Sequence, residues 1–208
     1  MPLVRKPAPP PPIAARASAE VSVLLATGSD EERWTAARAA ADSPDGATRL
    51  GEALQSEHDP RVREAILTSL ARIGTAQSAQ IVIPLLRSDD AQRRTAALDT
   101  LKTMRDAVRP LLPELLADAD PDVRLLVCEI VRDFPGDEPA ALLARLLENE
   151  HNPNVCAAAV EVLAENGGPA ALPALAICEE RFRDTPFLAF SIKIAVDRIR
   201  SQSGLPRV

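Results

Sequence analysis

Apolar residues recur along this chain at helical spacing, and the same pattern returns at a nearly fixed interval. Its clearest copy runs from Asp59 to Leu70, where Asp59 is expected as the N-cap and Pro60 as the first helical residue. The other copies begin at Ser29, Asp90, Asp120, Asn152 and Asp184, at intervals of 30 to 32 residues. A period in this range is typical of a solenoid, in which each helix pair packs on its neighbours.

A second apolar helix is predicted after each of the first five starts, beyond a short turn that contains Gly, Pro, Asp or Ala. The expected pairs are 30–41 with 46–56, 60–73 with 77–87, 91–104 with 108–117, 121–134 with 138–148, and 153–165 with 169–181. Short helices at 19–26 and 187–201 are expected to cover the two ends. No segment favours a strand. The pattern therefore predicts an all-α, right-handed α-solenoid of about five helix pairs with partial terminal caps.

Proline content sets the expected domain boundaries. The run Pro7 to Pro12 cannot build a core, so residues 1–17 are predicted to form a disordered tail, with docking to a proline-reading domain as the alternative. Residues 18–201 form the predicted repeat domain, and 202–208 form a short C-terminal tail.

The repeats resemble short bacterial HEAT repeats, of the kind also found in phycobilisome lyases. The resemblance lies in the Asp-Pro-x-Val-Arg start and in the Leu-Leu pair of the second helices, Leu85-Leu86, Leu115-Leu116 and Leu146-Leu147. It implies the paired-helix fold and, since most HEAT arrays are interaction scaffolds, a scaffold role. The stretch from Pro186 to Phe190, together with Arg181-Phe182, is similar to HEAT proteins encoded near bacterial chemosensory genes, which implies a place in a signalling system.

Charge and composition narrow the partner class. The formal net charge of −6 argues against nucleic acid, because phosphate binding needs clustered Lys and Arg. No apolar run suits a signal peptide or a membrane span, so a cytoplasmic protein is expected. The three cysteines have neither the number nor the spacing of a disulfide framework or a metal knuckle.

An arginine recurs four residues after the cap in four repeats, as Arg33, Arg63, Arg94 and Arg124. One interpretation is an anion-binding stripe. The favoured interpretation is structural: each arginine pairs with cap carboxylates such as Asp59, Asp90 and Asp120 in its own or the adjacent repeat. Trp34, one position further on, is expected to seal the N-terminal end rather than to bind a ligand.

Both histidines precede a cap, in Glu57-His58-Asp59-Pro60 and Glu150-His151-Asn152-Pro153. HEAT-fold hydroxylases hold iron with His-Glu pairs, but here the pairs are reversed and three repeats apart. Stacking of helix layers puts them roughly 25–30 Å from each other, too far to share an ion. We therefore expect turn residues, with no metal and no cofactor.

The cysteines offer no candidate nucleophile. Cys128 is expected in the core, whereas Cys156 and Cys178 are expected to be less buried, and none has a nearby histidine in the sequence. We predict that the protein is not an enzyme. The alternative is a HEAT-fold enzyme, such as a chromophore lyase or a metal-dependent hydroxylase.

The second helices carry a small, apolar, proline-rich face with few charges. Taking the Leu-Leu pair as register, its residues are Gln80, Ile83, Pro84, Arg87, Pro110, Pro113, Glu114, Ala141, Ala144, Arg145, Glu148, Leu172, Pro173 and Ala176. We name this set the second-helix strip. Two interpretations stay open: the prolines merely shape short helices, or the strip lines a concave face that binds a protein or peptide. The second predicts a non-enzymatic scaffold or adaptor.

Overall fold

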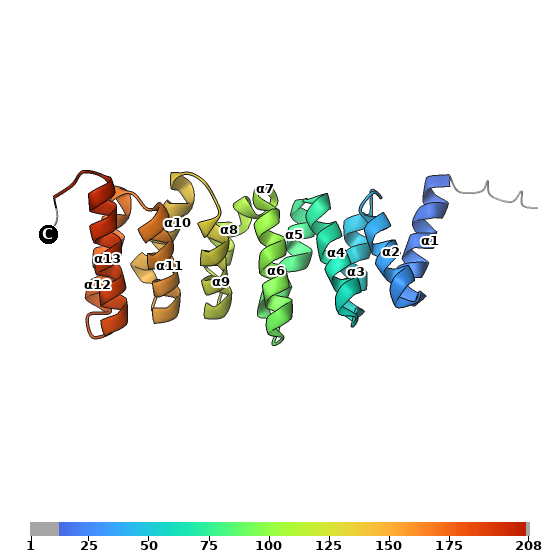
Figure 1. The fold of residues 1–208 in the computed structure, drawn as a ribbon, viewed down its shortest axis with the longest axis horizontal. Helices are drawn as coiled ribbons and strands as arrows, with labels where there is room; N and C mark the ends of the chain where they lie inside the picture. Colours follow the sequence, from blue (N-terminus) through green and yellow to red (C-terminus); the bar gives the residue numbers. More distant parts are fainter. Residues whose placement is uncertain (1–12, 207–208) are drawn as a thin grey trace, which may run out of the picture. The chain divides into compact units, whose positions relative to one another are not determined.

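The computed structural model describes the backbone of residues 13–206 and the side chains of residues 19–206. Within these ranges every regular element is a helix, which confirms the predicted all-α class of helix pairs (Figure 1). None of these helices is long and apolar enough to cross a membrane. The chain divides into two compact units between Ile81 and Val82, inside the single repeat domain predicted for residues 18–201.

The first unit contains the N-terminal helix and two repeats. Its helices are α1 (Ile13–Thr27), α2 (Asp30–Ala40), α3 (Gly46–Ser56), α4 (Pro60–Ile73) and the start of α5 (Ala76–Val82). Helix α2 packs between α1 and α4, and α3 packs on α4. The core is built from small and aliphatic side chains, among them Ala37, Ala40, Leu50, Ile66 and Leu70.

Helix α1 starts earlier than the sequence predicted. It begins at Ile13, so residues 13–17 are helical rather than part of a tail. The remaining tail prediction concerns residues 1–12, which lie outside the described part of the chain.

The second unit contains the remaining repeats. Its elements are the 3₁₀ helix η1 (Ile83–Arg87), α6 (Ala91–Thr103), α7 (Arg105–Val108), η2 (Arg109–Leu111), α8 (Leu112–Leu115), α9 (Pro121–Arg132), α10 (Asp137–Asn149), α11 (Pro153–Asn166), η3 (Pro169–Ala171), α12 (Leu172–Arg181) and α13 (Pro186–Gln202). The first helices pack in chain order: α9 contacts α6 and α11, and α11 contacts α13. Helices α10 and α12 pack beside each other as second helices.

Prolines interrupt several second helices that were expected to be continuous. Pro84 ends α5 at Val82 and leaves a 3₁₀ turn, because proline has no backbone N–H with which to continue the helix. The stretch predicted as one helix at 108–117 is split into α7, η2 and α8 around Pro110 and Pro113. The turn before α12 is likewise a 3₁₀ turn, which begins at Pro169. Proline therefore sets the shape of this face.

The predicted caps are confirmed for five of the six starts. Asp59, Asp90, Asp120 and Asn152 each accept hydrogen bonds from backbone N–H groups of the first turn, and Ser29 forms a capping box with Glu32. The sixth start differs, because Thr185 rather than Asp184 precedes α13, and it makes no side-chain cap bond. Gly74 caps the C-terminal end of α4, and its φ of 62° is the left-handed conformation that favours glycine at this position.

Candidate functional site

The second-helix strip points to solvent in both units. Eleven of its residues are exposed: Gln80, Pro84, Arg87, Pro110, Pro113, Glu114, Ala141, Arg145, Glu148, Pro173 and Ala176. Ile83, Ala144 and Leu172 are half-buried. Gln80 belongs to the first unit and all the others to the second. The inward neighbours Leu86, Leu115, Leu147 and Leu175 are buried, so the register inferred from the Leu-Leu pairs is correct.

The charged members of the strip differ in whether they have partners. Arg87 forms an ion pair with Asp118. Within the described residues, Glu114, Arg145 and the carboxylate of Glu148 have no ion pair. Most of the strip in the second unit is therefore Pro, Ala and aliphatic surface, interrupted by a few charges that a partner could bind.

A cavity of about 450 Å³ opens beside the strip in the second unit. It is lined by Leu116, Ala117, Asp118, Arg124, Arg145, Leu146, Asn149, Glu150 and His151. The structure thus brings one strip residue, Arg145, to the same hollow as one arginine of the ladder, Arg124.

Arg124 holds two successive turns together at the base of this cavity. Its Nε and one terminal nitrogen donate to the two carboxylate oxygens of Glu150 at 2.7 and 2.9 Å. The other terminal nitrogen donates to the carbonyls of Asp118 at 2.7 Å and Ala119 at 3.2 Å. Glu150 also accepts the backbone N–H groups of His151 and Asn152 at 2.9 and 2.8 Å. Every polar group of this buried carboxylate is therefore used.

The first unit repeats this arrangement. Arg33 donates to both carboxylate oxygens of Glu57, at 2.8 and 3.1 Å, and to the carbonyl of Gly28 at 2.9 Å. Glu57 accepts the backbone N–H groups of His58 and Asp59, each at 2.8 Å. The two Glu-His-Asx-Pro turns therefore have the same hydrogen-bond arrangement, in which the glutamate accepts from an arginine of the preceding repeat and from two backbone N–H groups.

Hydrogen bonding decides the charge of these two glutamates. Burial alone would raise the pKa of Glu57 and Glu150. The bonds from the arginine and from two backbone N–H groups outweigh burial, so each pKa lies below the ordinary range of a glutamate. Both are ionised near neutral pH.

The predicted partners of the ladder were wrong. The cap carboxylates of Asp59, Asp90 and Asp120 accept backbone N–H groups of their own helices and do not pair with the arginines four residues later. Arg94 donates to the carbonyls of Ser88 and Asp89 at 2.7 and 3.1 Å. Arg63 has no hydrogen-bond partner among the described residues of its own unit.

The actual partners, Glu57 and Glu150, were missed although the sequence signals them. The four-residue context repeats almost unchanged, and only the histidine in it was considered. In the structure His58 and His151 are exposed. The described residues contain no cluster of three His, Cys, Asp or Glu side chains that could hold a metal ion.

In the fifth repeat Cys156 takes the ladder position. Its thiol donates to the carbonyl of Glu150 at 3.6 Å. Arg181, from the end of α12, donates to the carbonyls of Leu147 and Glu150 at 2.8 Å each, and to that of Glu148. A guanidinium from another helix thus donates to the carbonyl of Glu150, which corresponds to the Ser88 and Asp118 carbonyls bound by Arg94 and Arg124.

All three cysteines are buried free thiols, which corrects the expectation for Cys156 and Cys178. The hydrogen bond shared with Cys178 and burial together raise the pKa of Cys156. Burial raises the pKa of Cys128 to about 12. The hydrogen bond with Cys156 lowers the pKa of Cys178, but this thiol is fully buried, whereas reactive cysteines are partly exposed.

The outward face of the last helix is apolar. Leu188, Ile192, Ala195 and Ile199 are buried, as expected for a helix that covers the end of the array. On its solvent face, however, α13 carries Phe187, Phe190 and Ile194, which are 52%, 66% and 49% exposed. Aligned apolar side chains in solvent are typical of an interaction surface.

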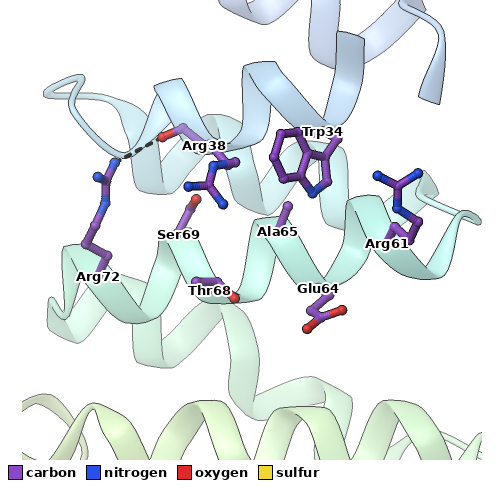
Figure 2. Close-up of a pocket in the computed structure, with 8 residues that line it drawn as sticks. All are labelled: Trp34, Arg38, Arg61, Glu64, Ala65, Thr68, Ser69 and Arg72. Carbon is purple, nitrogen blue, oxygen red and sulfur yellow. Dashed lines mark hydrogen bonds between the residues drawn. The ribbon is translucent and has the colours of Figure 1, made fainter. Parts of the chain in front are cut away.

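A second cavity, of about 290 Å³, lies in the first unit between α2 and α4. It is lined by Trp34, Arg38, Arg61, Glu64, Ala65, Thr68, Ser69 and Arg72 (Figure 2). The Arg38 guanidinium lies over the Trp34 ring, 4.8 Å from its centroid. Trp34 is only half-buried.

Comparison with known proteins identifies the family. HEAT repeats match residues 19–102 and 108–184, which together make up more than half of the chain. The protein therefore belongs to the HEAT-repeat family, and its fold is an all-α solenoid of HEAT repeats. HEAT repeats are commonly protein-interaction scaffolds.

Comparisons with curated proteins and with solved structures give less information than the family match. No curated protein matches the sequence. One similar solved structure is the crystal structure of an engineered protein from the Northeast Structural Genomics Consortium. It is 18% identical, covers 88% of this chain and 96% of its own, and superposes with a TM-score of 0.44.

Proposed function

We propose that this protein is a non-enzymatic scaffold or adaptor that binds a protein segment along the second-helix strip of residues 83–176. The observation that carries the proposal is the outward exposure of the strip's prolines and alanines beside the cavity at Arg145. An exposed surface of this composition suits a protein partner better than a phosphate backbone.

The physical character of the strip favours binding. Proline side chains are rigid, so covering Pro84, Pro110, Pro113 and Pro173 costs little conformational entropy. Arg145, exposed and without an ion pair among the described residues, offers a directional contact at the rim of the cavity. A partner segment covering the strip would bury roughly 800 Å² on each side.

Two further features support a scaffold. The exposed apolar face of α13 supplies additional surface for protein contact. The raised thiol pKa values of Cys128 and Cys156 weigh against thiolate chemistry. A bacterial chemosensory setting stays a prediction from the resemblance of the sequence, and a cytoplasmic location stays a prediction from its composition and apolar pattern.

The test is quantitative capture of partners by the tagged protein and two matched variants. The strip variant carries Ala141→Glu with Ala176→Glu, both at exposed positions. The control carries Ala39→Glu with Ala91→Glu, exposed positions on first helices with the same change of charge. Ile83 and Leu172 are less suitable for substitution because they are half-buried.

We expect a set of proteins that the wild type and the control retain equally and the strip variant loses by roughly tenfold or more, because central contacts dominate interface energy. Equal retention by the strip variant, with unchanged circular dichroism, would place the interface elsewhere. Stoichiometric metal or a covalent chromophore in the purified protein would contradict the non-enzymatic part of the proposal.

A further inference from the structure

We propose that the groove between α2 and α4 binds an anionic side chain of a peptide, a carboxylate or a phosphate, through Arg38 and Ser69 beside Trp34. This site lies wholly in the first unit, and it does not depend on the second-helix strip.

The geometry places four side chains toward one another. Arg38 and Trp34 extend from α2, and Ser69 and Ala65 extend toward them from α4, whereas Glu64 and Thr68 point away from this group (Figure 2). A cavity of about 290 Å³ is at the small end of the range for ligand sites, and so suits one or two side chains.

The charged side chains around the groove favour an anionic ligand. Arg38 has no carboxylate partner among the described residues, and its guanidinium is held over Trp34. Arg61 and Arg72 have partners in Glu31 at 3.7 Å and Asp42 at 3.2 Å, but all four of these side chains are more than half exposed. Exposed ion pairs of this kind contribute little stability, so an anionic ligand can replace Glu31 or Asp42 as the partner of the arginine. Since the lining carboxylate, Glu64, points away, the groove is locally cationic in a chain of net charge −6.

Ser69 supplies a second, independent indication of a ligand. The residue is only 4% exposed and lines the cavity, and its hydroxyl makes no hydrogen bond to the described residues. The hydroxyl is therefore free to donate to a ligand inside the cavity. An oxyanion placed between Ser69 and Arg38 would accept from both groups.

The scaffold around the site is already in place. Arg72 donates from α4 to the carbonyl of Arg38 at 3.0 Å and so ties the two helices together (Figure 2). The Trp34 ring and Ala65 provide apolar walls next to the cation. This combination suits an acidic residue flanked by an apolar one, and a guanidinium can bind either a carboxylate or a phosphate through two hydrogen bonds.

The chain carries its own probe for the test. Trp34 is its one tryptophan and it has no tyrosine, so intrinsic fluorescence reports on this groove. The full chain is titrated with three peptides of the same apolar sequence, which carry two glutamates, two phosphoserines or two glutamines. Calorimetry provides a readout that does not depend on the Trp34 signal.

We expect saturable binding of the glutamate peptide, the phosphoserine peptide or both, with the better one identifying the ligand, and no binding of the glutamine peptide. Binding should weaken as salt is raised. Arg38→Gln should weaken it roughly tenfold or more and Ser69→Ala by a smaller factor. The matched control, Arg105→Gln, changes an exposed arginine of the second unit and should bind as the wild type does.

Thermal melts followed by circular dichroism check that each variant is folded. The proposal is overturned if neither anionic peptide binds at millimolar concentration, if the glutamine peptide binds equally well, or if folded Arg38→Gln binds with wild-type affinity. None of these results bears on the second-helix strip, which the glutamate substitutions at Ala141 and Ala176 test separately.

Discussion

Arg94 and Arg124 stand at the same position of successive repeats, and each donates to the two carbonyls just before the cap of its own helix. Arg124 also reaches the carboxylate of Glu150, which stands two residues before the next cap. For Arg94 the corresponding residue is Asp118, one methylene shorter. That carboxylate accepts the backbone N–H of Asp120 at 3.0 Å and pairs with Arg87 instead.

The comparison shows which hydrogen bonds recur in most of the repeats. The carbonyl two residues before the cap receives a side-chain donor from Arg94, from Arg124, or from Cys156 with Arg181, whereas Arg63 makes no such bond among the described residues. The carboxylate is an addition found in two turns. Arg33, Arg94 and Arg124 are therefore committed to structural hydrogen bonds, which argues against an anion-binding role for these three and leaves arginines such as Arg38 and Arg145 available to partners.

The largest effect should come from removing the carboxylate. Glu150→Ala leaves a buried guanidinium and two backbone N–H groups without their acceptor, and we expect a loss of roughly 3 kcal/mol in the free energy of unfolding. Asp118→Ala removes a pair with a more exposed arginine and should cost only about 1 kcal/mol. Urea unfolding of the two variants measures both values. Equal losses in the free energy of unfolding would contradict the claim that the two turns differ.

A smaller effect should appear with pH. Because the pKa of Glu150 is lowered by folding, its contribution is fully present above the unfolded pKa of about 4.3 and is lost as pH falls through the folded pKa. Glu150→Gln cannot titrate, so the stability gap between wild type and this variant should be widest near pH 7 and should narrow below about pH 4. Urea titrations at several pH values measure the gap. A gap that stays constant down to pH 3 would contradict the claim that folding lowers the pKa of Glu150.

Much of the fold could be predicted because local signals agree with one another. An Asx cap, a proline at the first helical position and apolar residues at helical spacing together fix the start and the inward face of α4, α9 and α11. The start of α1 at Ile13 was missed because the preceding prolines suggested an extended chain. The 108–117 segment is divided around Pro110 and Pro113 into short α-helices and a 3₁₀ turn. The spacing of apolar residues does not distinguish such a segment from one continuous helix.

The sites were harder to predict, because they depend on contacts between repeats. Arg33 and Glu57 are 24 residues apart, and although the repeated Glu-His-Asx-Pro context marks the glutamate, it does not indicate that this arginine is its partner. The cavity at Trp34 arises only when Arg38 and Ser69 are brought together from different helices. The exposed face of the strip, by contrast, followed from the register of the Leu-Leu pairs alone.

The most direct test of this account is a pair of double-mutant cycles on the free energy of unfolding, one for Arg124 with Glu150 and one for Arg94 with Asp118. Each cycle uses the two alanine variants and their combination, and it isolates the coupling of the two side chains from their other contacts. We predict a coupling of about 1 kcal/mol or more for Arg124 with Glu150, and a coupling within about 0.5 kcal/mol of zero for Arg94 with Asp118. Equal couplings in the two cycles, or none between Arg124 and Glu150, would contradict the claim that the glutamate-bearing turns commit their arginines to structure.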